Sequence, residues 1–570
     1  MSEPRFLRRR PVRRALLAGL CAAALTVGAC SRADKSVVEE ITVDAASLDL
    51  SGADARALER HFTVAPRRGS EADTLAVLDA LGLGGRTDGR SIDGSTATYA
   101  DWQATQGSST VEAERVVLSG LHMDDGEPRY DALQADGVSV LDVQGQDRVE
   151  ARLASLVVVE PDAAFAADLV NVLSAVEQPD ETTAAITGQD APFRGLRVSD
   201  MRANVFQNVF GPDAPPDTAQ TGTLSLNQVV IGNDRDAGTV DMIVDTVDFD
   251  WGAGTAGQGE RTRLVMDGMT ALGVRMDVDA AGMARGGPMG VLGALTPGAE
   301  PPYREVDVGV MRVSSRVVDV DVSGFEADSE RAGDTLTLRS VLQPATLTLK
   351  DAADTPLAPF YDTLVENGLA EFSLKGSQTA VFNARADRVE VSEARFEIDE
   401  GLRLDCDYAL EGMAEAARAL EDSGVAPPDL DAVTPDTNFE DLVASMQAYE
   451  AARTEAQGRV RIAALDCSVQ DVADNSFVTR AYAVASDVSG MPVPVLKGQA
   501  KTAIAISSLT ARDPFQRDLM DTLGSGLIEF LDTPGQTLRV VVAPDAPVAL
   551  STLRGENAML APLNLSVTVE

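Results

Sequence analysis

Apolar and polar residues alternate along much of this chain, and no other feature restricts its possible folds as strongly. Val247, Phe249 and Trp251 alternate with aspartates, and valines occupy every second position of 306–310 and 318–322. Every second position of 402–410 holds leucine, cysteine or tyrosine. Successive side chains of a strand point to opposite faces, so each predicted strand has one apolar and one polar face. The pattern is typical of antiparallel sheets that pack on one side and meet water on the other.

Turn signals and helical patterns complete the predicted fold, which is β-rich α+β with long antiparallel sheets. Turns are predicted at Asp136-Gly137, Gln144-Gly145-Gln146 and Asp399-Glu400-Gly401, the last of which joins two strands in a hairpin. A few amphipathic helices are predicted over residues 74–81, 162–176, 413–423 and the segment that follows Asn438, a capping residue. We interpret the apolar stripe of the last helix as core packing and not as a ligand groove.

Two segments of the chain are similar in sequence and predict repeated helix-plus-strand units. The first runs from Pro359-Phe360 through Glu371-Phe372 to Gln378-Thr379, and the second from Pro514-Phe515 through Glu529-Phe530 to Gln536-Thr537. From Glu-Phe onward the two spacings are identical. A fainter third copy begins at Phe165, and chance similarity is the alternative for it. Each unit is predicted to be a short amphipathic helix followed by a strand, which is more typical of scaffolds and binding proteins than of enzymes.

Loops rich in glycine and proline divide the chain. Loops are predicted at 178–192 and 211–222, and the stretch 282–302 is the best domain boundary. We predict an N-terminal β-rich domain over 71–285 and a C-terminal β-rich domain over 303–570, with a helical insertion at 411–458. Residues 30–70 are predicted to form a tether and a first strand, and residues 1–29 are predicted to be a removable leader.

The leader has the pattern of a bacterial export signal. Six arginines lie within the first 14 residues, and an uncharged apolar run follows over 15–29. This run is shorter than the roughly 20 residues that cross a bilayer, and its length suits a signal peptide. Arg13-Arg14 is also similar to a twin-arginine export signal, although general arginine richness explains it equally well.

The end of the apolar run, Val27-Gly28-Ala29-Cys30, resembles the lipobox of bacterial lipoproteins. The resemblance implies that the Cys30 thiol is acylated, that cleavage occurs before this residue, and that the attached acyl chains anchor the protein. Ser31 at the next position implies sorting to the outer membrane, with the body on the periplasmic side. An ordinary signal peptide with an incidental cysteine is the alternative.

The chain is strongly acidic, with 89 acidic and 48 basic residues and a formal net charge of -41. Without residues 1–29, which hold six arginines and Glu3, it has 42 basic and 88 acidic residues and a net charge of -46. So acidic a body is repelled by nucleic acids and by anionic lipid. We therefore exclude a nucleic-acid partner and expect membrane attachment through the lipid alone. We interpret the charge itself as a source of solubility.

Cys406 and Cys467 are the two cysteines that remain beyond the leader and Cys30. Each follows Leu-Asp and lies at an apolar position of a predicted strand. In an oxidising periplasm these features predict a disulfide, which would close a loop of about 60 residues and stabilise the fold by roughly 4 kcal/mol. Two buried free thiols are the alternative. A zinc site is not expected, because the CxxC spacing and a nearby histidine are missing.

Motifs that would identify an enzyme or a cofactor site are weak. The GxGxxG pattern at 252–257 is followed by a predicted strand and not by the helix that a dinucleotide fold needs, so we predict a hairpin loop. His61 and His122, the two histidines of the chain, are predicted to lie at ordinary strand or edge positions. We expect no catalytic residue, cofactor or metal site, although 88 acidic residues leave a carboxylate pair open.

These patterns favour a non-catalytic envelope lipoprotein with a structural or binding role. The alternating strands and helix-plus-strand units over about 300–570 loosely resemble the AsmA-like extended β-domains of bacterial envelope proteins, some of which handle lipids. The resemblance implies a hydrophobic ligand or an envelope protein as partner, besides the membrane. An envelope hydrolase with a carboxylate-based site and a surface-exposed lipoprotein that meets external partners are the alternatives.

Overall fold

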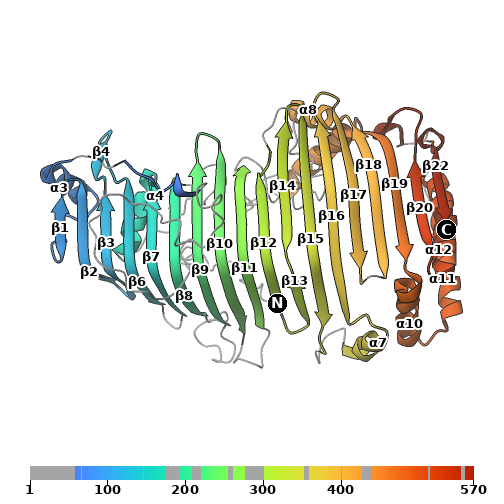
Figure 1. Cartoon of the computed structure of the whole chain (residues 1–570), viewed down its shortest axis with the longest axis horizontal. Helices are drawn as coiled ribbons and strands as arrows, with labels where there is room; N and C mark the ends of the chain where they lie inside the picture. Colours follow the sequence, from blue (N-terminus) through green and yellow to red (C-terminus); the bar gives the residue numbers. More distant parts are fainter. Residues whose placement is uncertain are drawn as a thin grey trace. The chain divides into compact units, whose positions relative to one another are not determined.

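The computed structural model describes residues 58–65, 67, 69–144, 147–174, 192–207, 220–253, 261–275, 301–351, 358–399, 401–425, 439–510, 514–553 and 559–570. These residues form a β-rich α+β fold with long antiparallel sheets, as predicted (Figure 1). The chain divides into two compact units, one of residues 1–277 and 305–316 and the other of residues 278–304 and 317–570. The predicted boundary at 282–302 lies almost wholly outside the described residues. The strand that follows it, β12 (Glu305–Ser314), belongs to the first unit.

The sheet of the first unit is an antiparallel meander. Its described strands, in spatial order, are β1 (Arg90–Asp93), β2 (Thr96–Gln106), β3 (Ser109–Ser119), β6 (Ala132–Gln144), β7 (Asp147–Val159), β8 (Gly195–Gln207), β9 (Gln220–Asp234), β10 (Thr239–Ala253), β11 (Arg261–Arg275) and β12. A small hairpin of β4 (His122–Asp124) and β5 (Glu127–Arg129) lies between β3 and β6 in the chain. Because β10 and β11 pair antiparallel, the GxGxxG segment joins a hairpin, as predicted.

The core of the first unit lies on one face of this meander. Apolar residues occupy the same row on consecutive strands, namely Tyr99, Val116, Ala135, Leu156, Val198, Val229 and Val244. Helices α3 (Glu71–Ala80) and α4 (Ala163–Leu173) contribute buried residues to the same cluster. The indole nitrogen of Trp102 donates a hydrogen bond to the carbonyl oxygen of Leu173, over 2.7 Å, and this bond fixes the end of α4 against β2.

A line of irregular positions crosses the middle of this sheet. Asp101, Gly137, Asp200 and Gly268 adopt positive φ angles within β2, β6, β8 and β11. At each of them the pairing skips one position on both partner strands, so the register is the same on either side. The apolar phase shifts by one at this line: in β10, Val244 and Val247 both belong to the core side although three residues separate them. The predicted turn at Asp136-Gly137 is wrong, because both residues lie inside β6.

The opposite face of the first unit is covered in part by the segment that precedes α3. Residues 58–62 form a helical turn, and Leu58 and Phe62 are buried against strand residues that include Val157 and Val230. His61 therefore lies in a turn and not in a strand, contrary to the prediction. His122 lies in β4, as predicted.

The second unit is likewise built on antiparallel β-sheet. Strands β13 (Val318–Val322) and β14 (Phe325–Ala332) both pair with β15 (Thr335–Leu349), and the order continues through β16 (Glu371–Asn383), β17 (Arg388–Ile398), β18 (Leu402–Glu411), β19 (Arg461–Asp471), β20 (Thr537–Val542) and β22 (Leu565–Val569). The short strand β21 (Val548–Ala549) pairs with the start of β19. Ile398 pairs with Leu402, which confirms the hairpin predicted at Asp399-Glu400-Gly401.

Two of the predicted helices interrupt this sheet between β18 and β19. Helix α8 (Met413–Asp422) packs Met413 and Ala416 against a cluster that contains Leu336 and Phe382. Helix α9 (Phe439–Gln457) follows, and its predicted cap Asn438 lies outside the described residues. Met446 of α9 is exposed, so the apolar stripe of this helix is only partly packed.

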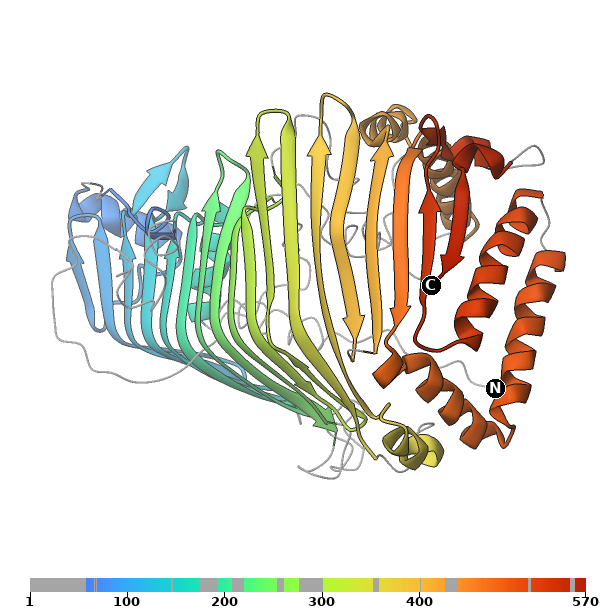
Figure 2. The ribbon, with the colours of Figure 1, turned by 45° about the vertical axis from the view of Figure 1, so that its right-hand side comes forward.

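Three consecutive helices follow β19, where we predicted one short helix. They are α10 (Phe477–Ser489), α11 (Val493–Thr510) and α12 (Pro514–Asp532) (Figure 2). The buried carboxylate of Asp471 holds the start of this layer, because it accepts hydrogen bonds from Ser476 Oγ, from Val478 N and from Gly535 N before β20. Ser476 caps α10, and Gly490 ends it in a left-handed conformation.

The repeated sequence segments have only partly similar structures. Each contains a helix followed by a strand: α7 (Tyr361–Glu366) precedes β16, and α12 precedes β20. The matched residues differ, because Glu371-Phe372 begins a strand whereas Glu529-Phe530 lies within a helix. The residue-by-residue equivalence is therefore wrong. The proposed third copy corresponds to α4, which ends before residues 175–191, outside the described part.

Candidate functional site

One face of the sheet in the second unit is apolar across several strands. Tyr408 of β18 pairs with Val391 and Leu465, and Leu465 pairs in turn with Val542. The next rows of the same face are Cys406, Cys467, Val540 and Val567, then Phe396, Leu404, Val469, Leu538 and Val569. Most of these side chains are only half-buried, so the rest of the unit covers this face incompletely.

The opposite face of the same strands is charged. Arg395 Nε lies 2.9 Å from Asp405 Oδ1, and Arg539 Nη2 lies 2.6 Å from Asp466 Oδ2. Hydrogen bonding from the Arg539 guanidinium holds the pKa of Asp466 below its ordinary value. Such exposed pairs contribute little to stability, but they keep this face in water. An apolar ligand would therefore bind to the other face.

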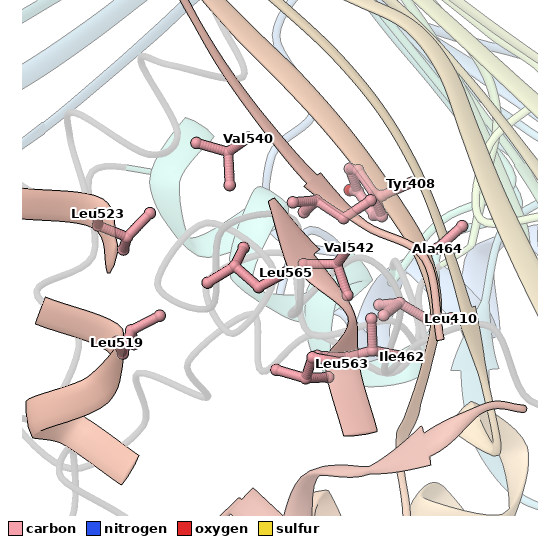
Figure 3. Close-up of a pocket in the computed structure, with 11 residues that line it drawn as sticks. Tyr408, Leu410, Ile462, Ala464, Leu519, Leu523, Val540, Val542, Leu563 and Leu565 are labelled. Atoms are coloured by element: carbon pink, nitrogen blue, oxygen red, sulfur yellow. The ribbon is translucent and has the colours of Figure 1, made fainter. Parts of the chain in front are cut away.

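A cavity of about 260 Å³ lies between the apolar face and helix α12 (Figure 3). Leu519 and Leu523 of α12 form one wall. The other lining residues are Tyr408, Leu410, Ile462, Ala464, Leu465, Val540, Val542, Leu563 and Leu565. They come from four neighbouring strands and from the turn before β22, so segments more than 150 residues apart in the chain form a single cavity.

The spacing of α12 from the sheet is set by glycine. A Cβ atom at Gly526 would lie 2.4 Å from Val567 Cγ1 and 3.1 Å from Leu538 Cδ1, so the helix backbone touches the sheet there. Leu523 and Leu519, three and seven residues earlier, lie on the same side of the helix, and there the cavity separates helix from sheet. On another side of α12, a Cβ atom at Gly524 would lie 2.9 Å from Ile504 of α11.

Alanine at two helical glycines should change stability in opposite directions. Gly526→Ala is expected to lower the free energy of unfolding by about 1 kcal/mol or more, because its methyl group overpacks against Val567. Gly498→Ala in α11 is expected to raise it by about 0.5 to 1 kcal/mol, because this position meets open space and alanine favours helix. Urea denaturation of both variants measures the difference. Stabilisation of the protein by Gly526→Ala would contradict the close contact.

The side chains that line the cavity are almost entirely hydrocarbon. Tyr408 carries the one polar side-chain group among its lining residues, and burial raises the pKa of this phenol, which therefore stays uncharged at neutral pH. The cavity lies between four neighbouring strands on one side and one helix on the other. An apolar space between two such layers fits an extended chain better than a bulky ligand.

Cys406 and Cys467 border this cavity. They lie directly opposite each other on β18 and β19, with the two sulfurs at disulfide distance, as the sequence predicted. Tyr408 and Leu465, the next paired residues of the same face, line the cavity, and Val540 lies opposite Cys467 on β20. The pair therefore ties together two strands that form the floor of the cavity.

Besides Asp471, several buried ionisable groups of the kind that a hydrolase would need lie in the first unit. His61 Nε2 is 3.4 Å from Asp241 Oδ2, and both side chains are almost completely buried. Asp241 also accepts a hydrogen bond from Gly273 N over 2.7 Å and pairs with Arg60 at 3.3 Å. These contacts hold the N-terminal turn on the sheet. We interpret them as structural.

The second histidine lies in another structural cluster. Arg67 Nε is 2.9 Å from Asp131 Oδ2, and His122 Nδ1 is 3.9 Å from Asp131 Oδ1. Burial raises the pKa of Asp131, and the positive charge of Arg67 opposes this shift. Within the described ranges, no group of three or more histidine, cysteine, aspartate or glutamate side chains could hold a metal ion.

Sequence reasoning identified some of these residues and missed others. It predicted the apolar phase of β18 and β19 and the cysteine pair, whereas Cys30 lies outside the described residues. It missed Leu519, Leu523 and the role of α12 as a wall. The spacing of these two leucines by four residues was the available signal, because it places both on one side of a helix.

Comparisons with known proteins say little about activity. A family model described as "Uncharacterized protein" matches residues 395–570, a segment that contains every residue lining the cavity. No curated protein matches the chain. In the part of the chain that the structure describes, no helix combines the length and the hydropathy needed to cross a membrane.

Proposed function

We propose that this protein is a lipid-anchored protein of the bacterial outer membrane that binds a hydrocarbon chain on its periplasmic side without catalysing a reaction. The acyl chains on Cys30 attach it to the membrane. The apolar face of the second unit, with α12 above it, holds the ligand. The ligand class is a linear apolar chain, such as the acyl chain of a lipid.

The observation that carries this proposal is the cavity beneath α12. Enclosed apolar cavities of about 150 Å³ accept small hydrocarbons, and this partly open cavity has a volume of about 260 Å³. Its lining offers hydrocarbon contact almost everywhere, so it favours a ligand that forms few hydrogen bonds. The half-buried apolar rows beside it extend the same surface to Phe396 and Leu404.

The envelope hydrolase receives less support. Such an enzyme needs a carboxylate that contacts bound substrate in a cleft, whereas the cavity has no acidic lining residue. The buried Asp241 and Asp471 accept hydrogen bonds from backbone amides of their own units. These hydrogen bonds give both carboxylates a structural role.

Lipid analysis of protein purified from the envelope tests the proposal. Cys30→Ser should remove the lipid anchor and allow purification as a soluble protein without detergent, because the thiol that takes the acyl chains is gone. We expect mass spectrometry of this soluble protein to detect a co-purifying acyl lipid at a near-stoichiometric level. A periplasmic protein of similar charge, purified in parallel, controls for carry-over. A spectrum free of bound lipid would refute ligand binding, and a parent protein whose Cys30 carries no acyl chains would refute the anchor.

A further inference from the structure

Helix α11 has an exposed side without charge, which is unusual in so acidic a chain. Over residues 493–507 the exposed positions recur as 494–495, 498–499, 502–503 and 505–506. At about 100° per residue, these positions cover one continuous half of the helix. They hold proline, valine, glycine, glutamine, threonine, alanine and isoleucine. Val495 and Ile506, which are 48% and 50% exposed, lie on the same line, eleven residues apart.

The two charges of α11 point the other way. Lys497 Nζ donates a hydrogen bond over 3.0 Å to the carbonyl oxygen of Asp532, at the end of α12, and Lys501 pairs with the Asp532 carboxylate. Ile504, on the same inner side, meets Gly524 of α12. Figure 2 shows α11 beside α12, the wall of the cavity. Helix α11 therefore packs on this wall with its charged side and presents its uncharged side outward.

We propose that the uncharged side of α11 docks on the surface of a lipid bilayer. A chain with a net charge of -41 is repelled by anionic surfaces, so a face that meets lipid must lack acidic residues. The whole of α11 contains no aspartate or glutamate, whereas the exposed side of α12 carries Asp518, Asp521 and Glu529. Val495 and Ile506 would enter the interface between headgroups and acyl chains.

A second copy of this chain fits the same face less well than a lipid bilayer does. An 18-residue helix is about 27 Å long and 10 Å wide, so its face covers roughly 270 Å², well below the roughly 800 Å² per partner of a stable protein interface. A membrane contact needs less area, because the anchor at Cys30, part of the proposed function on which this inference rests, keeps the protein near the bilayer. Docking there would place the cavity wall α12 next to the source of an acyl chain.

Flotation with vesicles tests the docking face. The probe is a vesicle of neutral phosphatidylcholine, and the protein is the full exported chain with Cys30→Ser, so that attachment does not depend on its own lipid. At a large excess of lipid, which replaces the local concentration that the anchor provides, we expect this protein to float with the vesicles, and less so when anionic phosphatidylglycerol is added. The double substitution Val495→Asp and Ile506→Asp should reduce the floating fraction at least fivefold. Met123→Asp, at a residue in β4 that is 46% exposed, is the matched control and should have no effect.

The possible outcomes separate docking from ligand binding. Circular dichroism and thermal unfolding verify that the aspartate variants are folded, and binding of a fluorescent fatty acid is measured separately. Equal flotation of the double variant and its parent would overturn the proposal, as would a failure to float. A dimer in sedimentation that the double variant abolishes would assign the face to a second copy instead. Flotation without fatty-acid binding would refute the proposed function and leave the docking face standing.

Discussion

Tryptophan at position 523 should nearly abolish hydrocarbon binding. The side chain of Leu523 points from α12 into the cavity of about 260 Å³ (Figure 3). An indole at this position would occupy the space that the ligand needs, and its contacts with Val540 and Leu565 would replace those of the ligand. We expect the dissociation constant of a fluorescent long-chain fatty acid to rise at least tenfold, a loss of about 1.4 kcal/mol or more.

The control for this change is Met520→Trp on the same helix. Met520 is 42% exposed, so the larger side chain remains in solvent and the cavity stays open. Affinity should remain within about twofold of the parent, a difference of less than 0.5 kcal/mol. Thermal unfolding of both variants verifies that α12 is still packed. Unchanged affinity in Leu523→Trp would show that the fatty acid binds elsewhere, and equal losses in both variants would indicate a general disturbance of the helix layer.

Removal of the cysteine pair should have the largest effect on stability. Cys406 and Cys467 are 61 residues apart in the chain, and their bond closes a loop that contains α8 and α9. In the chain-entropy model, such a cross-link stabilises a protein by about 4 kcal/mol, because it restricts the unfolded chain. The double substitution Cys406→Ala and Cys467→Ala should lower the free energy of unfolding by about that amount. Urea denaturation followed by circular dichroism measures it.

A reducing agent provides the internal control. It should destabilise the parent protein to the level of the double alanine variant and leave the variant itself unchanged, since only the parent has a bond to reduce. The native spectrum should persist in both, because the hydrogen bonds between β18 and β19 hold the strands in register without the sulfurs. Equal denaturation midpoints for the oxidised and reduced parent would show that the two cysteines are free thiols.

The strands and their faces could be predicted from the sequence because their pattern is local. Leu402, Leu404, Cys406 and Tyr408 alternate with polar residues, and the pleat of a strand places all four on one face. The same phase brought Cys406 and Cys467 to apolar positions of their strands. The shift of the apolar phase within the strands of the first unit could not be predicted in this way. Gly137 looked like a turn, and only its neighbours in β3 and β7 show that the strand continues past it.

The helices after β19 were harder to predict. Helix α11 is rich in valine, isoleucine and threonine, which favour strands. Its helical state depends on packing against α12 through Ile504 and Gly524, and on the cap and hydrogen bonds that Asp471 organises before α10. Such tertiary contacts override intrinsic propensity.

The alternation of apolar and polar residues along the chain therefore determined the strands, the apolar face and the positions of the two cysteines, because each depends on residues a few positions apart. The cavity depends on distances between elements that the chain brings together only on folding. Tyr408, Leu523 and Leu565 lie far apart in sequence, and the space between them exists because α12 touches the sheet at Gly526 and leaves it at Leu523. A local pattern specifies which side of a strand is apolar, but only the packed helix determines how much of that side remains open to a ligand.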